Sequence, residues 1–196
     1  MPRFVDQPLS AFLDALASAE PTPGGGTAAA IAGAMGASLL MMVAGLTKSR
    51  TGSEAERVAL AEARASLTSV CARLTTLADA DTDAFNQVMA AYRLPKASDA
   101  EKAARNDAIQ QALKAATTTP LDTLRAAAEG LRIGGVVKAH GNPSAASDVD
   151  VGLGLLRAAA EGAAANVSIN LESIQDEAFK KATADAVAKC RATFNA

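Results

Sequence analysis

Hydrophobic positions along this chain recur at helical spacing from one end to the other. Apolar side chains at Leu9, Phe12 and Leu16 predict a short amphipathic helix over 4–19. Further segments with the same period are predicted over 53–94, 98–118, 120–137, 147–170 and 173–194. Prolines or glycines separate several of them, and no alternating run of β-branched residues appears. The pattern predicts an all-α fold, a bundle of about six to eight helices.

The segment 27–47 differs from the others because it has no charged side chain in 21 residues. Its length matches a bilayer span, but it consists largely of alanine and glycine, which insert poorly into membranes. We therefore expect a central Ala/Gly-rich helix, capped by Thr27 and buried on all sides of the bundle, and no membrane span. Small residues also suit such a helix to a subunit interface.

Asp81 interrupts the apolar stripe of the 53–94 segment, which is predicted to form one long helix or a pair of helices. At 100° per residue, apolar side chains lie within about 40° of it on the same face, namely Leu67, Val70, Leu74, Leu77, Phe85, Val88 and Tyr92. Asp79 and Asp83 point to the opposite face, where solvation accounts for them. An unpaired buried carboxylate costs several kcal/mol or has its pKa raised. Asp81 is therefore either a paired structural residue or an acid or base in a cleft between helices.

Two further features have both a structural and a functional interpretation. Pro21-Thr22-Pro23 precedes Gly24-Gly25-Gly26 at the start of the uncharged helix, and this is either a flexible linker or a shaped turn whose N–H groups bind an anion. Asp148, Asn166 and Asn170 share one face of the 147–170 helix with small and apolar residues. Their polar groups serve either hydrogen bonds between helices or a pocket for a flat heterocycle.

Composition excludes several classes of function. The chain has 196 residues, which fits a single domain over 1–196, and a net charge of −2 with 3% aromatic residues, which argues against a nucleic-acid partner. Cys71, Cys190 and the lone His140 form no disulfide, zinc or catalytic-triad pattern. Ala84 and Ala90 replace the glycine and glutamate of a calcium loop, so we expect no metal. With no signal peptide at its start, the chain is expected to be cytoplasmic.

Four motifs follow one another in the order seen in a known family. They are Pro21-Thr22-Pro23-Gly24-Gly25-Gly26-Thr27, Asp81-x-x-Ala84-Phe85 followed by Leu94-Pro95-Lys96, Gly141-Asn142 with Ser147-Asp148, and Asn166-x-x-x-Asn170 followed by Asp176-Glu177-Ala178-Phe179. In these motifs nearly the whole chain resembles the cyclodeaminase/cyclohydrolase family, which comprises the C-terminal domain of formiminotransferase-cyclodeaminase and stand-alone methenyltetrahydrofolate cyclohydrolases. The resemblance implies a helical homodimer that binds folate near the subunit interface, with no cofactor beyond the tetrahydrofolate substrate.

The resemblance also implies roles for individual residues. Asp81 falls on the family's catalytic carboxylate, and the implied substrate-binding residues are Pro23, Gly24, Gly25, Gly26, Phe85, Lys96, Asn142, Ser147, Asp148, Asn166 and Asn170. In one reaction of this family, water attacks the methenyl carbon of 5,10-methenyltetrahydrofolate. A carboxylate suits that reaction because the methenyl carbon belongs to a cationic amidinium, and because the attacking water must lose a proton. Lys96 is either a ligand for the glutamate carboxylates of folate or a solvated surface lysine.

Three functional hypotheses follow. A methenyltetrahydrofolate cyclohydrolase would convert 5,10-methenyltetrahydrofolate to 10-formyltetrahydrofolate, whereas a formiminotetrahydrofolate cyclodeaminase would form the methenyl compound from 5-formiminotetrahydrofolate and release ammonia. We expect the cyclohydrolase, because no formiminotransferase domain accompanies this sequence to supply a formimino group. The third hypothesis is a non-catalytic helical module that binds a partner.

Overall fold

The computed structural model describes residues 3–194, and within that range it contains only helices and their connections. The all-α prediction is confirmed. The six α-helices are α1 (Leu9–Ala17), α2 (Gly25–Ala44), α3 (Glu54–Tyr92), α4 (Asp99–His140), α5 (Ala146–Glu172) and α6 (Glu177–Phe194). Two short 3-10 helices, η1 (Phe4–Asp6) and η2 (Pro143–Ala145), precede α1 and α5.

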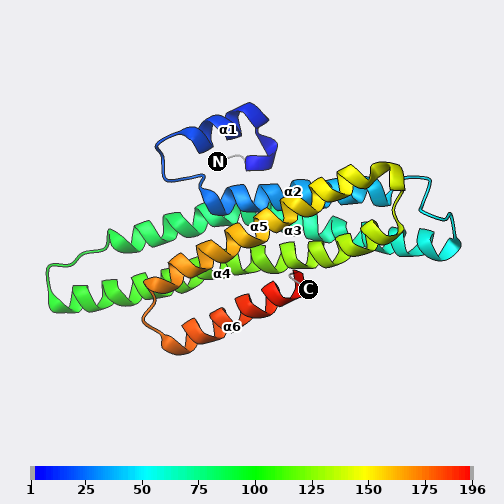
Figure 1. Cartoon of the computed structure of the whole chain (residues 1–196). Coiled ribbons are helices and arrows are strands. Elements are labelled where there is room, and N and C mark those ends of the chain that lie inside the picture. Colours follow the sequence, from blue (N-terminus) through cyan, green and yellow to red (C-terminus); the bar gives the residue numbers. More distant parts are fainter. Residues whose placement is uncertain (1–2, 195–196) are drawn as a thin grey trace.

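Helices α2 to α5 form the central bundle, α6 packs along α4, and α1 lies outside the bundle at the beginning of α2 (Figure 1). The facing sides of the four central helices meet through fully buried leucines, namely Leu40, Leu67, Leu74, Leu124 and Leu156. Burial of each such side chain contributes roughly 1.5–3 kcal/mol to folding. The core therefore runs along the length of the bundle. It holds the four central helices in position, including the ends that could surround a functional site.

Helix α2 contacts α3, α4 and α5 closely because its residues are small. At Gly36, for example, an added Cβ would lie 2.6 Å from the carbonyl oxygen of Gly152 on α5. Over residues 3–194, α2 is the one helix long and apolar enough to cross a membrane, and just over half of its apolar stretch is buried inside the protein. The expectation of burial on all sides was wrong, because Met35 is 51% exposed and Met42 is 43% exposed.

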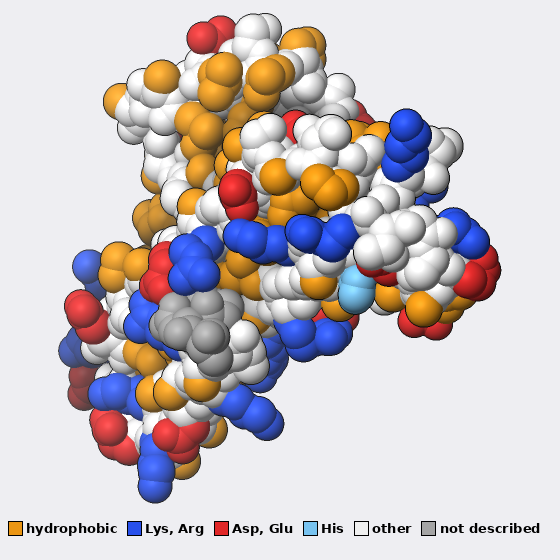
Figure 2. All heavy atoms as spheres, turned by 45° about the vertical axis from the view of Figure 1, so that its right-hand side comes forward, with side chains coloured by type: hydrophobic (Ala, Val, Ile, Leu, Met, Phe, Trp, Pro, Cys, Tyr) orange, Lys and Arg blue, Asp and Glu red, His pale blue; other side chains and the backbone are white. Residues whose placement is uncertain are grey.

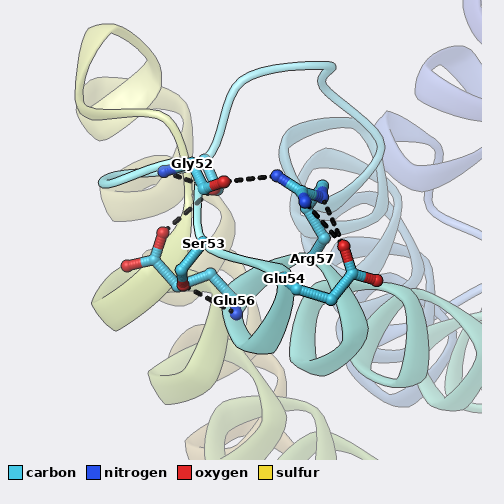
Figure 3. Close-up of polar contacts among 6 residues, drawn as sticks. Gly52, Ser53, Glu54, Glu56 and Arg57 are labelled. Atoms are coloured by element: carbon cyan, nitrogen blue, oxygen red, sulfur yellow. Dashed lines mark hydrogen bonds and ion pairs between the residues drawn. The ribbon is translucent and has the colours of Figure 1, made fainter.

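The connection from α2 to α3 is held by hydrogen bonds around the first turn of α3 (Figure 3). Ser53 caps α3 by accepting a hydrogen bond from the Glu56 backbone N–H at 3.2 Å. The Glu56 carboxylate accepts hydrogen bonds from the Ser49 hydroxyl at 2.9 Å and the Thr51 N–H at 2.8 Å. Gly52 has a φ of 76°, a conformation that other residues rarely adopt. Glu56 thus ties Ser49 and Thr51 of this loop to the first turn of α3.

Helix α4 continues through Pro120, so the prediction of two helices separated at this residue was wrong. Proline has no N–H, and the carbonyl oxygen of Ala116, four residues earlier, therefore lacks its normal helical donor. The Asn170 side-chain amide of α5 donates to that oxygen instead, at 3.2 Å. The helix tolerates proline because a neighbouring helix supplies the missing hydrogen bond.

The starts of three helices also differ from the prediction. Gly24, not Thr27, is the N-cap of α2, and Thr27 is the third helical residue. Helix α5 begins at Ala146, directly after η2, so neither Ser147 nor Asp148 is its N-cap. Ser173 ends α5 instead of starting α6. Helix α6 begins at Glu177, where the Asp176 carboxylate accepts a hydrogen bond from the Phe179 N–H at 3.0 Å.

The N-terminal segment attaches to the bundle through α3. The Phe4 N–H donates to the Asp79 carboxylate at 2.9 Å, so solvation alone does not account for Asp79 as the sequence had suggested. Phe12 of α1 is buried, and its ring packs edge-on against that of Phe4 with centroids 5.8 Å apart. Leu9 and Leu13 remain 64% and 54% exposed, and hydrophobic side chains gather over α1 at the top of Figure 2.

Candidate active site

A cavity of about 300 Å³ opens where the N-terminus of α2 meets α3, α4 and α5. Segments far apart in the sequence converge here, because α2 packs against both α3 and α5 while α4 packs against the same two helices. The residues lining the cavity are Pro21, Thr22, Gly24, Gly25, Gly26, Asp81, Ala84, Phe85, Val88, Leu113, Ala116, Asn166 and Asn170. The predicted carboxylate, the three glycines, Phe85 and both asparagines are therefore brought together.

The Asp81 carboxylate lies directly against the first turn of α2. An added Cβ at Gly26 would be 2.2 Å from Oδ1 and 2.7 Å from Oδ2, so only glycine fits between the two helices at this point. The Thr27 hydroxyl lies 3.1 Å from Oδ2. The first N–H groups of a helix lack intrahelical partners and carry partial positive charge. The start of α2 therefore provides a favourable electrostatic environment for a carboxylate at Asp81.

Burial raises the pKa of Asp81 above its ordinary value. Hydrogen bonds from the hydroxyl and backbone N–H of Thr27 lower the pKa, but burial has the larger effect. Asp81 is also the one titratable side chain among the residues lining the cavity. A half-buried carboxyl of this kind, facing space for a ligand, is suited both to accept and to donate a proton.

Asn170 of α5 combines the two interpretations suggested by the sequence, a hydrogen bond between helices and a place in the cavity wall, whereas Asn166 lines the cavity but bonds within its own helix. Asn166 donates to the Gly162 carbonyl of its own helix at 3.0 Å, and Asn170 donates to the Ala116 carbonyl of α4 at 3.2 Å. Both side chains also line the cavity. Within residues 3–194 their carboxamide oxygens have no hydrogen-bond donor, so each can still bind a ligand.

Pro23 and Lys96 lie outside the cavity wall. Pro23 is buried within the turn, and its neighbours Thr22 and Gly24 face the cavity. Lys96 is exposed in the connection after α3, and Tyr92, at the end of that helix, is eleven positions beyond Asp81, about 17 Å along the helix. Lys96 can therefore contact only a long ligand that extends along α3.

The motif around Asn142, Ser147 and Asp148 lies at the opposite end of the bundle. Asp148 and Asn166 are eighteen positions apart in α5, about 27 Å along the helix. The Asn142 side chain accepts a hydrogen bond from the Ser144 N–H at 3.0 Å and so shapes the turn into η2. Within one chain, these three residues do not share the Asp81 cavity.

Thr27 is the polar residue at this site that the sequence analysis assigned to another role. It was predicted to cap α2, yet its hydroxyl reaches across to α3 and contacts Asp81. The sequence did offer one signal for this contact: a threonine inside a helix without charged residues is expected to be buried, and a buried hydroxyl needs a hydrogen-bond partner. Of the apolar wall residues, Val88 already belonged to the predicted Asp81 stripe, whereas Leu113 carried no distinctive signal.

A larger cavity of about 600 Å³ lies at the other end of α2, between its last turn and the start of α3. Arg57 and Arg64 line it beside apolar residues, and no carboxylate, histidine or cysteine does so. It therefore lacks a group that can exchange a proton near neutral pH. In the described part of the chain, no three His, Cys, Asp or Glu side chains are grouped as a metal site would require. The smaller Asp81 cavity is the better candidate for chemistry.

Comparison with known sequences shows which proteins this chain is similar to. The profile of the formiminotransferase-cyclodeaminase family matches residues 8–189. A methenyltetrahydrofolate cyclohydrolase from Methylorubrum extorquens is 42% identical over 177 residues, which cover 89% of this chain and 84% of that protein. A formimidoyltransferase-cyclodeaminase from Gallus gallus is 37% identical over 186 residues, which cover 94% of this chain but 34% of that protein. The chain thus spans about a third of the length of the second relative.

Comparison of structures gives a similar result. The crystal structure of a formiminotetrahydrofolate cyclodeaminase from Thermotoga maritima superimposes with a TM-score of 0.85. The two chains are 31% identical, and the superposition covers 96% of this chain and 90% of that one. The similarity therefore extends over the whole helical bundle and is not limited to the motifs around the cavity.

Proposed function

This chain belongs to the formiminotransferase-cyclodeaminase family of folate one-carbon enzymes, and from that premise we propose that it is a methenyltetrahydrofolate cyclohydrolase. The observation that carries the proposal is the position of Asp81, half-buried at the start of α2 and facing a cavity. The 42% identity to a cyclohydrolase over most of both chains favours this activity over the cyclodeaminase.

In the proposed reaction, water adds to the methenyl carbon of 5,10-methenyltetrahydrofolate. Asp81 in its ionised form favours the cationic substrate and accepts a proton from the attacking water. The bond between that carbon and N5 then breaks: Asp81 returns its proton to N5, the hydroxyl of the adduct releases its proton to solvent, and the formyl group stays on N10. The raised pKa of Asp81 suits this role, because a carboxylate with a higher pKa is a stronger base near neutral pH.

The cavity is proposed to hold the flat ring system of the folate. Phe85 and Val88 provide an apolar wall, and the carboxamides of Asn166 and Asn170 provide hydrogen-bonding groups. The N–H groups of the Gly24 to Gly26 turn are available to oxygen atoms of the ligand. The glutamate end of the substrate would then extend along α3 toward Lys96, which is one of the two interpretations of Lys96 that the sequence left open.

The two activities of the family are distinguished with one preparation of protein. Loss of the near-ultraviolet absorbance of 5,10-methenyltetrahydrofolate reports cyclohydrolase activity, and ammonia release from 5-formiminotetrahydrofolate reports cyclodeaminase activity. We expect the first rate to exceed the buffer rate and the second to equal it. Ammonia release without accelerated hydrolysis would favour the cyclodeaminase, the activity named for the Thermotoga maritima structure and the Gallus gallus relative.

A non-catalytic role makes a different prediction for Asp81. If the carboxylate were only structural, Asp81→Leu would increase the melting temperature and no folate reaction would be accelerated by the wild type. If Asp81 is catalytic, Asp81→Leu eliminates the acceleration while the protein stays folded. A thermal melt and a rate assay on the same two proteins separate these cases.

We also propose that the chain forms a homodimer through the outward face of α2. This face presents Ile31, Met35, Leu39 and Met42 at helical spacing, and α2 carries no charge that would oppose burial. We expect light scattering to show a dimer for the wild type and a monomer for the double variant Met35→Glu/Met42→Glu. Val58→Glu, which alters an exposed apolar residue on α3, is the matched control and should remain dimeric. A monomeric wild type would contradict the proposal.

A further inference from the structure

The Thr27 hydroxyl lies between three oxygen atoms of α3. Its Oγ1 is 3.1 Å from Oδ2 of Asp81, 3.2 Å from the Ala78 carbonyl oxygen and 3.5 Å from the Thr82 hydroxyl. Thr27 is fully buried, and it belongs to a helix without charged residues. A buried hydroxyl in contact with a reactive carboxyl is a strong hydrogen-bonding partner, because water does not compete with it.

A hydroxyl has one hydrogen to donate and can accept at the same oxygen. When Asp81 is ionised, Thr27 donates to Oδ2. When Asp81 carries a proton on Oδ1, Oδ2 is the carbonyl oxygen of the acid and still accepts the hydrogen bond from Thr27. Both arrangements use the same oxygen positions, so the carboxyl group keeps its orientation when it changes protonation state.

We propose that Thr27 is the positioning residue for Asp81, holding Oδ2 in both protonation states so that Oδ1 exchanges the proton with water or substrate. Among the described residues, no side chain other than Thr27 makes a hydrogen bond with the Asp81 carboxyl group. Both oxygens lie close to Gly26, which has no side chain to cover them, and among the described residues Oδ1 has no side-chain hydrogen-bond partner. The role of Thr27 rests on the proposed function, since it acts through Asp81.

Other charged groups near the cavity are already engaged or point away from it. On α3, Asp79 accepts a hydrogen bond from the N-terminal segment and Asp83 is exposed. On α4, Lys114 pairs with Asp176 at 2.6 Å. Helix α5 has no charged residue from 162 to 171, and Glu20, before the glycine turn, is exposed. Thr27 is therefore the principal side-chain influence on the protonation of Asp81.

The test removes the hydroxyl while preserving the shape of the side chain. Thr27→Val should move the acidic limb of the pH profile of kcat/KM upward by about one unit or more, because the carboxylate loses a donor. We expect kcat to fall by a larger factor than KM rises, and Thr27→Ser should restore the wild-type midpoint. Thr123→Val, which removes a buried hydroxyl bonded within α4, is the matched control and should keep that midpoint.

A second measurement does not depend on turnover. Carboxyl carbon NMR of the protein labelled at aspartate follows the titration of Asp81, with the signal assigned by its absence in Asp81→Asn. The midpoint should rise in Thr27→Val, or in Thr27→Ala if the valine variant fails to fold, and stay at the wild-type value in Thr27→Ser. An unchanged midpoint in the folded hydroxyl-deleted variant overturns the role of Thr27. A folded wild type without folate turnover instead overturns the proposed function, so the two failures are distinguishable.

Discussion

Gly26→Ala is a small substitution that should inactivate the protein through steric displacement of Asp81. The new methyl group would lie 2.2 Å from Oδ1, 2.6 Å from Cγ and 2.7 Å from Oδ2 of that carboxylate. Ordinary contacts to a Cβ begin at 3.4 Å, so the carboxylate or the first turn of α2 must move by about 1 Å. Displacement of a reacting group by this distance can reduce the rate on the order of 10²-fold.

The effect on stability should be much smaller than the effect on activity. Alanine favours a helix over glycine by up to about 1 kcal/mol, which partly offsets a steric cost of about 1–3 kcal/mol. Gly154→Ala is the matched control, because Gly154 lies inside α5 with no atom within 4 Å of the added methyl group. We expect this control to keep full activity and to gain some stability.

The assay compares kcat/KM for 5,10-methenyltetrahydrofolate hydrolysis and the melting temperature of wild type, Gly26→Ala and Gly154→Ala. A loss of about 100-fold in Gly26→Ala alone, with a cooperative melt, supports the close approach of α2 to Asp81. Activity within threefold of wild type in Gly26→Ala would refute the reasoning, because the carboxylate would then tolerate displacement.

Two further predictions concern the bundle that positions the site. The Ser49 and Thr51 donors lower the pKa of Glu56 from 4.5 to about 2, so its stabilising effect is complete above pH 4.5 and is lost as the pH falls toward 2. The free energy of unfolding of Glu56→Gln should therefore depend less on pH between 4.5 and 2 than that of wild type. Glu62→Gln, at an exposed residue, is the control and should behave like wild type. Identical acid-unfolding curves for all three proteins would contradict this prediction. Asn170→Leu should cost about 1–3 kcal/mol by removing the donor to the α4 carbonyl, as measured by chemical denaturation. Pro120→Ala should stabilise the Asn170→Leu variant more than it stabilises wild type, and equal effects would indicate no coupling.

Much of the fold could be predicted from periodicity and helix-end signals. The 53–94 pattern corresponds to the continuous helix α3, and the uncharged segment corresponds to α2. The sequence near Pro120 could not show that the helix continues through this residue, because the compensating hydrogen-bond donor is Asn170, fifty residues later in the chain. The start of α6 was misassigned because both Ser173 and Asp176 are residue types found at helix ends.

Helical periodicity could group residues of the candidate site where they share one face of a helix. Asp81 and Phe85 share the α3 stripe, Asn166 and Asn170 share the α5 face, and all four line one cavity. Thr27 could not be placed in this way, because its partner belongs to another helix and its sequence position suggested a cap. Tertiary contacts between distant segments determine such residues, and helical periodicity does not describe them.

The central claim is that the Asp81 carboxylate performs the reaction on a bound folate. The most direct measurement compares the rate of 5,10-methenyltetrahydrofolate hydrolysis by wild type, Asp81→Asn and Asp83→Asn, with each protein shown to be folded. The position of Asp81 in the cavity predicts a loss of about 10²–10⁴-fold for Asp81→Asn and near wild-type activity for Asp83→Asn, which alters an exposed residue two positions away. Equal rates for all three proteins, or rates no faster than buffer alone, would contradict the claim.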